Sequence, residues 1–204
     1  MILNKRKKIG PPNEDGIEQT ADYYSKIYMK PYPKENYDPI FNKVMDYISK
    51  LDVKDLCVLD IGCGIGELTR RLREKGFRAE QYFGFDFSEK GIQIARQNNM
   101  EWSHRFSVHN CYNLDKIRFD YDLAVAIEVL EHIQDLKVLP KLKTGAFFIG
   151  SVPNFWASGN AHLRVYPNNN FIKNRFNPYL EFRDWHRHRY NKYRCIYTFL
   201  AEKR

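Results

Sequence analysis

The sequence predicts an α/β fold, in which helices cover both faces of a mostly parallel sheet. Two observations carry this prediction. Short apolar runs, typical of buried parallel strands, alternate with segments of helical periodicity between residues 55 and 155. The first run, Val58–Ile61, enters a glycine-rich turn before a helix predicted at 67–75, a junction that open parallel sheets use to bind ligands.

A loop with glycine at every second position follows Asp60, at Gly62, Gly64 and Gly66. Glycine adopts positive φ without steric cost and leaves room for a ligand against the main chain. The nearest competitor is the dinucleotide fingerprint G-x-G-x-x-G, but here the third glycine comes one residue early. An acidic residue at the mouth of the loop suits a cationic ligand and would repel a pyrophosphate.

The elements that follow place further polar groups at the same edge of the sheet. A second strand at 81–86 ends in Asp86, near the offset of roughly 20 residues expected for a ribose-binding carboxylate. A carboxylate can accept hydrogen bonds from both ribose hydroxyls. Ser88 is then predicted to cap a helix over 89–98, and a third strand is predicted at 106–110.

Two further segments complete a recognisable pattern. The fourth strand, 121–127, runs into E-V-L-E-H-I at 128–133, and the fifth, 146–152, ends in S-V-P-N at 151–154. Together with D-x-G-x-G-x-G at 60–66, these segments resemble the class I S-adenosylmethionine (SAM) dependent methyltransferases, notably the ubiquinone-pathway O-methyltransferases. The resemblance covers the middle of the chain well and its ends only loosely.

The resemblance implies a Rossmann-like sheet of seven strands with an antiparallel edge strand. Residues 179–185 and 192–202 alternate in part between apolar and polar side chains and suit a hairpin that supplies the last two strands. A short helix is predicted before them, at 169–176. The region 154–178 overhangs the strand ends, and we expect it to form the substrate loop that shapes the acceptor pocket.

Residues 16–52 are predicted to hold two helices, at 17–29 and 37–51. The resemblance implies that these helices form a lid over the cofactor. Tyr24 and Tyr28 recur at helical spacing and are candidates for contact with the cofactor. The alternative is that both tyrosines only pack the lid against the core.

The resemblance implies SAM as cofactor and S-adenosylhomocysteine as product. Asp86 is expected to hold the ribose, and Phe87 to pack on the ribose or adenine. Asn110 stands where the family often has an acid facing the adenine amino group, and its amide can make that contact instead. The candidate cofactor residues are Asp60, Gly62, Gly64, Gly66, Asp86, Phe87, Asn110, Cys111, Glu128, Tyr24 and Tyr28.

Methyl transfer to a hydroxyl requires alignment of the acceptor and a base that removes its proton. His132 follows the fourth strand directly, where the family places catalytic groups, and histidine has an ordinary pKa near 6.5. His162, on the overhanging loop, is the second catalytic candidate. The alternative is that His132 only caps or orients its loop.

The spacing E-x-x-E-H at 128–132 leaves a metal hypothesis open. Glu128, Glu131 and His132 converge if a helix starts there, and His162 could join them as a fourth ligand of a divalent ion. This spacing also resembles small-RNA 3′-terminal 2′-O-methyltransferases. Sequence spacing is a weak ligand signal, so a site without metal is the favoured interpretation.

Length and composition indicate the domain organisation and the cellular location. The 204 residues suit one domain, which we assign to 16–204, whereas the polar, basic residues 1–15 are expected to form a disordered tail. The four cysteines form no metal pattern and no evident disulfide framework. No segment has the apolar length of a membrane span or of a signal peptide, so a cytoplasmic protein without a membrane partner is expected.

Three functions follow, in order of preference. The first is a methyltransferase for a small-molecule or sugar acceptor, at oxygen more than at nitrogen. The second is an RNA-modifying enzyme, which the net charge of +8 and the basic, aromatic run 183–190 would serve, although such a run is more often a solvated hairpin. The third is a SAM-binding protein without catalysis. The sequence does not indicate an oligomeric state.

Overall fold

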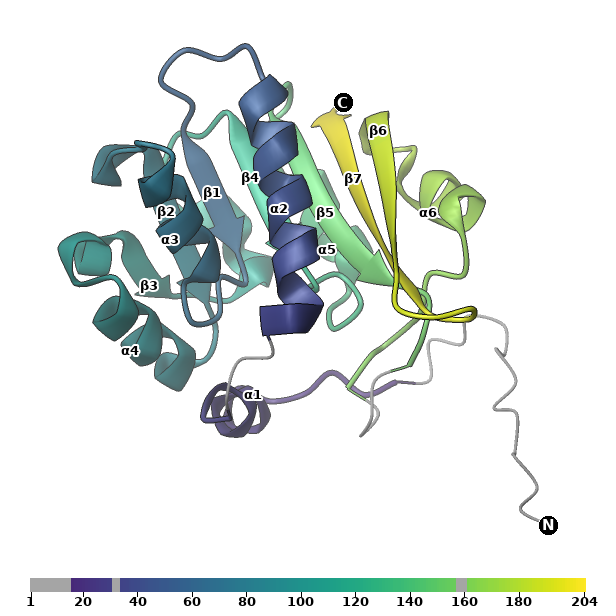
Figure 1. Ribbon diagram of the computed structural model, residues 1–204, viewed down its shortest axis with the longest axis horizontal. Helices are drawn as coiled ribbons and strands as arrows, with labels where there is room; N and C mark the ends of the chain where they lie inside the picture. The colour runs from purple at the N-terminus through teal and green to yellow at the C-terminus, as the bar shows by residue number, and fades with distance from the viewer. Residues whose placement is uncertain (1–15, 31–33, 157–160) are drawn as a thin grey trace.

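A seven-stranded sheet forms the centre of the computed structural model, in the order β3-β2-β1-β4-β5-β7-β6 (Figure 1). The structure describes residues 16–30, 34–156 and 161–204, and the predicted tail at 1–15 lies outside them. The strands are β1 (Val58–Ile61), β2 (Tyr82–Asp86), β3 (Phe106–Val108), β4 (Leu123–Ile127), β5 (Phe147–Pro153), β6 (Leu180–Arg189) and β7 (Cys195–Lys203).

The predicted Rossmann-like sheet is confirmed. The first five strands pair in parallel, whereas β7 runs antiparallel between β5 and β6. The predicted hairpin is therefore present: β6 runs past the expected bounds of 179–185 to Arg189, whereas β7 begins later than the expected 192–202 and ends at Lys203. A register shift between Phe182 and Asp184 marks a bulge in its outer strand.

Helices cover both faces of the sheet. They are α1 (Ala21–Tyr28), α2 (Lys34–Lys50), α3 (Glu67–Glu74), α4 (Glu89–Asn98), α5 (Asp135–Val138) and α6 (Asn169–Phe176), with 3₁₀ turns η1 (Ala79–Gln81), η2 (Met100–Arg105), η3 (Cys111–Lys116) and η4 (Leu139–Lys141). Helix α1 begins later than the predicted residue 17, because the Thr20 side chain accepts a hydrogen bond from the Tyr23 N–H as an N-cap. The Ser88 side chain caps α4 as predicted, by accepting from the Gly91 N–H.

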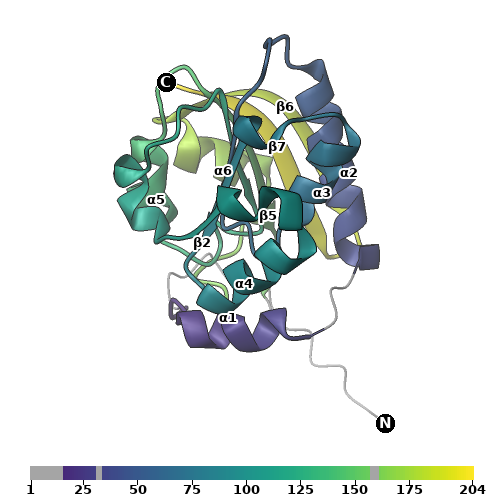
Figure 2. The same cartoon turned by 90° about the vertical axis from the view of Figure 1, so that its left-hand side faces the viewer.

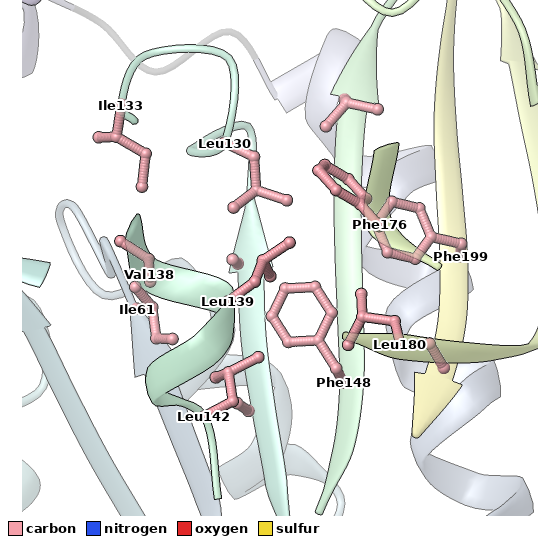
Figure 3. Packing of buried hydrophobic residues seen from close by; sticks show 14 of the residues in the cluster. Ile61, Leu130, Ile133, Val138, Leu139, Leu142, Phe148, Phe176, Leu180 and Phe199 are labelled. Atoms are coloured by element: carbon pink, nitrogen blue, oxygen red, sulfur yellow. The ribbon is translucent and has the colours of Figure 1, made fainter. Parts of the chain in front are cut away.

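Successive side chains of each strand face opposite sides of the sheet, so the core has two halves. Phe148 packs with Phe176 and Leu139 on the side of α5 and α6 (Figure 3). Its neighbour Ile149 packs with Val44 on the side of α2 and α3. Each fully buried side chain of this kind stabilises the fold by about 2 kcal/mol.

The strand order reverses between β1 and β4, and this switch point positions the site. Loops that leave neighbouring parallel strands here diverge to opposite faces and open a crevice at the carboxyl ends. Helix α1 crosses this edge of the sheet, at the bottom of Figure 1, and packs against α4 (Figure 2). None of the described helices combines the length and the apolar character needed to cross a membrane.

Candidate functional site

A cavity of about 500 Å³ lies at the carboxyl ends of β1, β2 and β4, under α1. Its wall brings together segments that are distant in the sequence. The candidate residues that line it are Gly62, Gly64, Asp86, Phe87, Asn110, Cys111, Glu128, Tyr24, Tyr28, His132 and His162, together with Glu131. Lys30, Tyr37 and Glu67 also line it and were not singled out from the sequence.

The glycine loop forms the floor of the cavity. Gly62 has a φ of 69° and Gly64 a φ of 53°, which other L-residues rarely adopt. A Cβ at Gly62 would lie 2.6 Å from the Val129 side chain, so the loop packs too closely for a larger residue. The Gly64 N–H donates to Asp86 Oδ2 at 3.1 Å, which ties the loop to the end of β2.

Two candidates, Asp60 and Gly66, do not line the cavity. The Asp60 carboxylate was expected at the mouth of the loop, but it is buried beneath the loop and accepts a hydrogen bond from the Tyr82 hydroxyl at 2.9 Å. Burial raises its pKa to about 7. Gly66 is the N-cap of α3, with a φ of 83°, and it faces the Asn99 side chain instead of the cavity.

Asp86 is the central hydrogen-bond acceptor at the end of the cavity that the glycine loop forms, called the cofactor half from here on. Its carboxylate is 3% exposed. Oδ1 accepts from the Ser88 N–H at 2.8 Å, and Oδ2 accepts from the Gly64 N–H and from the Tyr28 hydroxyl at 3.0 Å. Burial raises the pKa of Asp86, and these hydrogen bonds oppose that rise.

The wall beside Asp86 holds Phe87, Asn110 and Cys111. The Phe87 ring meets the Tyr24 ring edge-on, with centroids 5.4 Å apart. The Asn110 side-chain oxygen accepts from the Tyr112 N–H at 2.9 Å, so its position is fixed by the turn that it caps. Burial raises the pKa of the Cys111 thiol to about 12, which keeps this sulfur protonated and unreactive.

Glu128 follows β4 with a φ of 55°, a strained conformation for a residue with a side chain. The helix start at 128 on which the convergence of Glu128, Glu131 and His132 depended does not form: a turn follows β4, and α5 begins only at Asp135. The Ser151 hydroxyl accepts from the Glu128 N–H at 2.9 Å and donates to Oε1 at 2.8 Å. Burial raises the pKa of Glu128 to about 7.

The turn after β4 nevertheless brings Glu131 and His132 to His162. One ligand-type atom from each lies within 4.8 Å of the other two, and Glu128, the fourth candidate ligand from the sequence, is not part of this group. Among the described residues, no hydrogen-bond donor reaches either carboxylate oxygen of Glu131, which is fully buried. Burial and the neighbouring Glu128 raise the pKa of Glu131 well above its ordinary value.

Backbone carbonyls orient the two histidines. His132 Nδ1 lies 2.8 Å from the Ala161 oxygen, and His162 Nδ1 lies 3.0 Å from the Phe155 oxygen. Because a carbonyl can only accept, each Nδ1 carries the proton and each neutral ring has its lone pair on Nε2. Burial lowers the pKa of His132 to about 4 and that of His162 to about 3, so both rings are neutral.

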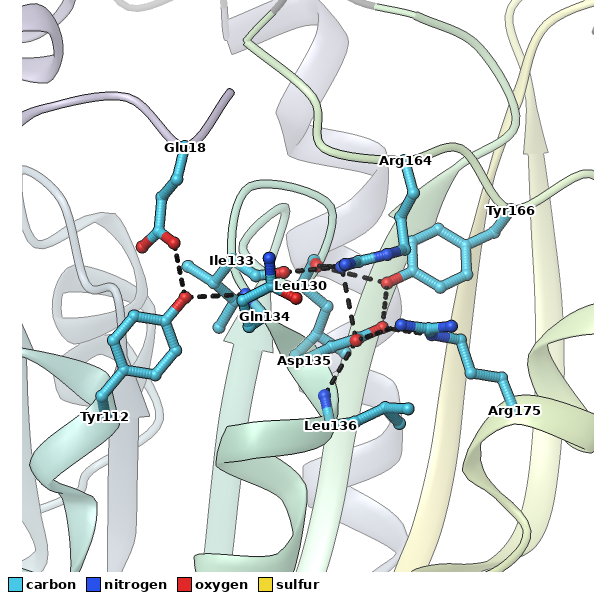
Figure 4. A network of polar contacts seen from close by, with 10 residues as sticks. All are labelled: Glu18, Tyr112, Leu130, Ile133, Gln134, Asp135, Leu136, Arg164, Tyr166 and Arg175. Carbon is cyan, nitrogen blue, oxygen red and sulfur yellow. Dashed lines mark hydrogen bonds and ion pairs between the residues drawn. The ribbon is translucent and has the colours of Figure 1, made fainter. Parts of the chain in front are cut away.

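A buried ion pair holds the two histidine-bearing segments together (Figure 4). Arg164 Nη1 lies 3.3 Å from Asp135 Oδ1 and donates to the Leu130 oxygen at 3.2 Å and the Ile133 oxygen at 2.6 Å. Tyr166 and Arg175 donate to the same carboxylate. This network was not predicted from the sequence, because charged residues at such spacings are usually solvated.

A family model described as a methyltransferase domain matches residues 34–191. The chain belongs to this methyltransferase family. The match includes strands β1 to β6 and every residue of the glycine loop, whereas β7 lies beyond its end.

Curated relatives of this methyltransferase-family chain are named ubiquinone biosynthesis O-methyltransferases. That of Idiomarina loihiensis is 32% identical over 88 residues, which are 41% of this chain and 35% of the relative. That of Bradyrhizobium diazoefficiens is 36% identical over 88 residues, 42% of this chain and 33% of the relative. The chain thus spans about a third of the length of these relatives.

Solved structures share the fold of this methyltransferase-family chain. The PH0226 protein of Pyrococcus horikoshii has a TM-score of 0.65 at 18% identity and covers 91% of this chain and 100% of its own. Magnesium protoporphyrin IX methyltransferase of Synechocystis, solved with bound SAM, has a TM-score of 0.59 at 16% identity, covering 93% and 86%.

Proposed function

We propose that this chain is a SAM-dependent methyltransferase that transfers a methyl group to a hydroxyl of a small-molecule or sugar acceptor. One observation carries the proposal: a single cavity holds the glycine loop with Asp86 at one end, and Glu131, His132 and His162 at the other. The first set suits a nucleoside, and the second can handle an acceptor proton.

The residues of the first end fit SAM. Asp86 would accept the ribose hydroxyls, while Gly62 and Gly64 line the cavity with backbone atoms alone. Phe87 and Asn110 would flank the adenine, and the uncharged Cys111 side chain would line the same part of the cavity. The bound cofactor would supply a methyl group already activated on a sulfonium. A cavity of about 500 Å³ is within the usual range of roughly 300–1,000 Å³ for such ligands.

We assign the base role to His132. Its Nδ1 is held by the Ala161 carbonyl, so Nε2 is the atom that receives the acceptor proton. Glu131 Oε1 lies 3.7 Å from this Nε2. Burial favours the neutral carboxyl at rest, and an ionised Glu131 would stabilise the imidazolium once it forms. Burial lowers the pKa of His132, so the ring is neutral at pH 7 and its Nε2 lone pair can accept a proton from a hydroxyl within hydrogen-bonding distance.

The acceptor half of the cavity favours a small, partly apolar molecule. Tyr24, Ile27, Tyr37 and Phe41 line the cavity, with the Tyr24 ring 5.5 Å from the His132 ring, and aromatic walls of this kind bind planar or apolar groups. The relatives named ubiquinone biosynthesis O-methyltransferases support oxygen as the methylated atom. A small-molecule acceptor therefore ranks before a macromolecule.

An RNA acceptor is the second candidate, favoured by two observations. The tip of the β6–β7 hairpin exposes Arg187, Arg189 and Arg194, which suit a phosphate backbone. Glu131 and the histidines also offer a donor set that suits a divalent ion, which would polarise an acceptor hydroxyl as a Lewis acid. Their separations of up to 4.8 Å exceed the roughly 4 Å possible around one ion, so the side chains would have to close in.

Turnover of SAM separates these functions. The protein is incubated with SAM and, separately, phenols, sugars and short RNAs, and S-adenosylhomocysteine is quantified. We expect product with a small hydroxylated acceptor, and a His132→Asn variant should lose at least about a hundredfold in kcat. Product only with RNA would favour the second candidate, and binding of SAM without product from any acceptor would favour a non-catalytic SAM-binding protein.

A further inference from the structure

Helix α1 places a tyrosine on the carboxylate at the centre of the cofactor half of the cavity. The Tyr28 hydroxyl donates to Asp86 Oδ2 at 3.0 Å. Its ring covers the glycine loop and the start of α4, so that a Cβ at Gly64 would lie 3.3 Å from it and a Cβ at Gly91 only 2.8 Å. Both glycines therefore leave room for this ring. Figure 2 shows α1 lying along α4, in the position that allows this contact.

The hydrogen bonds of Asp86 leave too few acceptor positions for a nucleoside. A carboxylate offers about four lone-pair positions. The Ser88 N–H uses one on Oδ1, and the Gly64 N–H and the Tyr28 hydroxyl use two on Oδ2. A ribose diol that donates both hydroxyls needs two positions, so one of the present donors has to leave.

Tyr28 is the donor that can leave. The Ser88 N–H belongs to the capped start of α4, and Gly64 lies within the glycine loop, so both donors are fixed by the backbone of the site. The Tyr28 hydroxyl sits at the end of a side chain with two rotatable bonds, on a helix of eight residues none of which is fully buried. Burial and Asp86 raise the pKa of Tyr28 well above its ordinary value, so the hydroxyl keeps its proton and remains a donor.

We propose that the Tyr28 hydroxyl stands in for one ribose hydroxyl on Asp86 and is displaced when the cofactor binds. Tyr28 then sets the cofactor affinity, because every binding event has to break its hydrogen bond to a buried carboxylate. The contact also satisfies Asp86 while no nucleoside is present. This inference rests on the proposed function, since it assumes that the ribose of SAM binds Asp86.

Calorimetric titration with S-adenosylhomocysteine tests the proposal on three forms of the full chain. Tyr28→Phe removes the competing hydroxyl and keeps the ring, so it should bind about tenfold more tightly than the wild type, the effect of one hydrogen bond to a charged group. Ser25→Ala is the matched control. It removes the 2.9 Å contact between the Ser25 and Ser88 hydroxyls, which anchors the same helix without touching Asp86. We expect its affinity to stay within about twofold.

Two further ligands test whether the change in affinity depends on the ribose hydroxyls. Adenosine should gain affinity in Tyr28→Phe, whereas 2′,3′-dideoxyadenosine, which has no hydroxyl to place on Asp86, should not. Unchanged or weaker binding of S-adenosylhomocysteine by Tyr28→Phe would overturn the proposal, as would an equal gain in Ser25→Ala, which would trace the effect to loosening of α1. If the wild type and both variants, all folded, bound no S-adenosylhomocysteine at millimolar concentration, the proposed function itself would fail.

Discussion

The imidazole rings of His132 and His162 meet edge-on inside the cavity, with centroids 4.8 Å apart. One residue belongs to the turn after β4 and the other to the segment that precedes α6. Each ring is held by a backbone carbonyl at Nδ1, so their contact is set by the fold and not by a charge. This pair makes the acceptor half of the cavity sensitive to pH.

Acid should destabilise the fold through this pair. The pKa of His162 is lowered to about 3 and that of His132 to about 4, both below the unfolded value near 6.5. The stability gained from neutral rings is therefore present above about pH 6.5 and is lost as the pH falls toward 4. We expect the urea midpoint to drop between pH 7 and pH 4.5, and to drop less in His162→Asn. The exposed His104→Asn is the control, and equal drops in all three forms would contradict the prediction.

Glu128 should destabilise the fold as the pH rises, the opposite of the effect expected for the two histidines. Burial raises its pKa to about 7, so its contribution to stability is present below its unfolded pKa near 4.5 and is lost as the pH rises through 7. Glu128→Gln removes the cost of ionising a buried carboxyl. The difference in melting temperature between this variant and the wild type should be a few degrees more favourable to the variant at pH 8 than at pH 5. Glu80→Gln, on the surface, should show no such gain, and a constant difference for Glu128→Gln would refute the assignment.

Much of this fold was readable from the sequence because its signals are local. The apolar run Val58–Ile61 and the glycines after it mark a buried strand and its turn regardless of what surrounds them. Asp86 could be placed for a similar reason, since it ends a strand that must lie beside the first. The carboxyl ends of parallel neighbours meet at one edge of the sheet.

The positions that were misplaced depend on contacts between distant residues. Asp60 was expected in the cavity, but its side chain accepts a hydrogen bond from Tyr82 on the neighbouring strand. No local sequence pattern shows this contact. Glu128 would join Glu131 and His132 only if a helix started there, yet it has a positive φ and a turn follows it. The pairing of Asp135 with Arg164 links the start of α5 to the segment before α6, and no sequence spacing indicates it.

The ion pair between Asp135 and Arg164 leads to a prediction about stability. Asp135→Asn would leave the Arg164 guanidinium, which is 1% exposed, buried without a counter-charge. Removing one member of a buried ion pair costs about 3–5 kcal/mol, so we expect a large drop in melting temperature. Asp46→Asn, which breaks two surface ion pairs, should leave the melting temperature nearly unchanged. Similar small effects in both variants would mean that the pair does not hold the loops.

A divalent ion tests the donor set of Glu131, His132 and His162. If this set holds a divalent ion, as the second candidate function requires, Zn²⁺ or Mn²⁺ should raise the melting temperature of the chelator-treated protein, since a ligand that binds only the folded state stabilises it. Glu131→Gln should abolish the rise. Glu67→Gln, which changes another carboxylate of the same cavity, should retain it. A rise of equal size in wild type and Glu131→Gln would place the ion elsewhere.

The most direct measurement is the affinity for S-adenosylhomocysteine of the wild type, Asp86→Ala and Asp60→Asn, determined by calorimetry at pH 7.5. Asp86→Ala should weaken binding by at least about thirtyfold, because two hydrogen bonds from the ribose to a carboxylate are lost. Asp60→Asn, whose side chain lies beneath the cavity and can still accept from Tyr82, should stay within about threefold. A wild type that binds no S-adenosylhomocysteine, or an Asp86→Ala variant that binds it as tightly, would contradict a cofactor site built on Asp86.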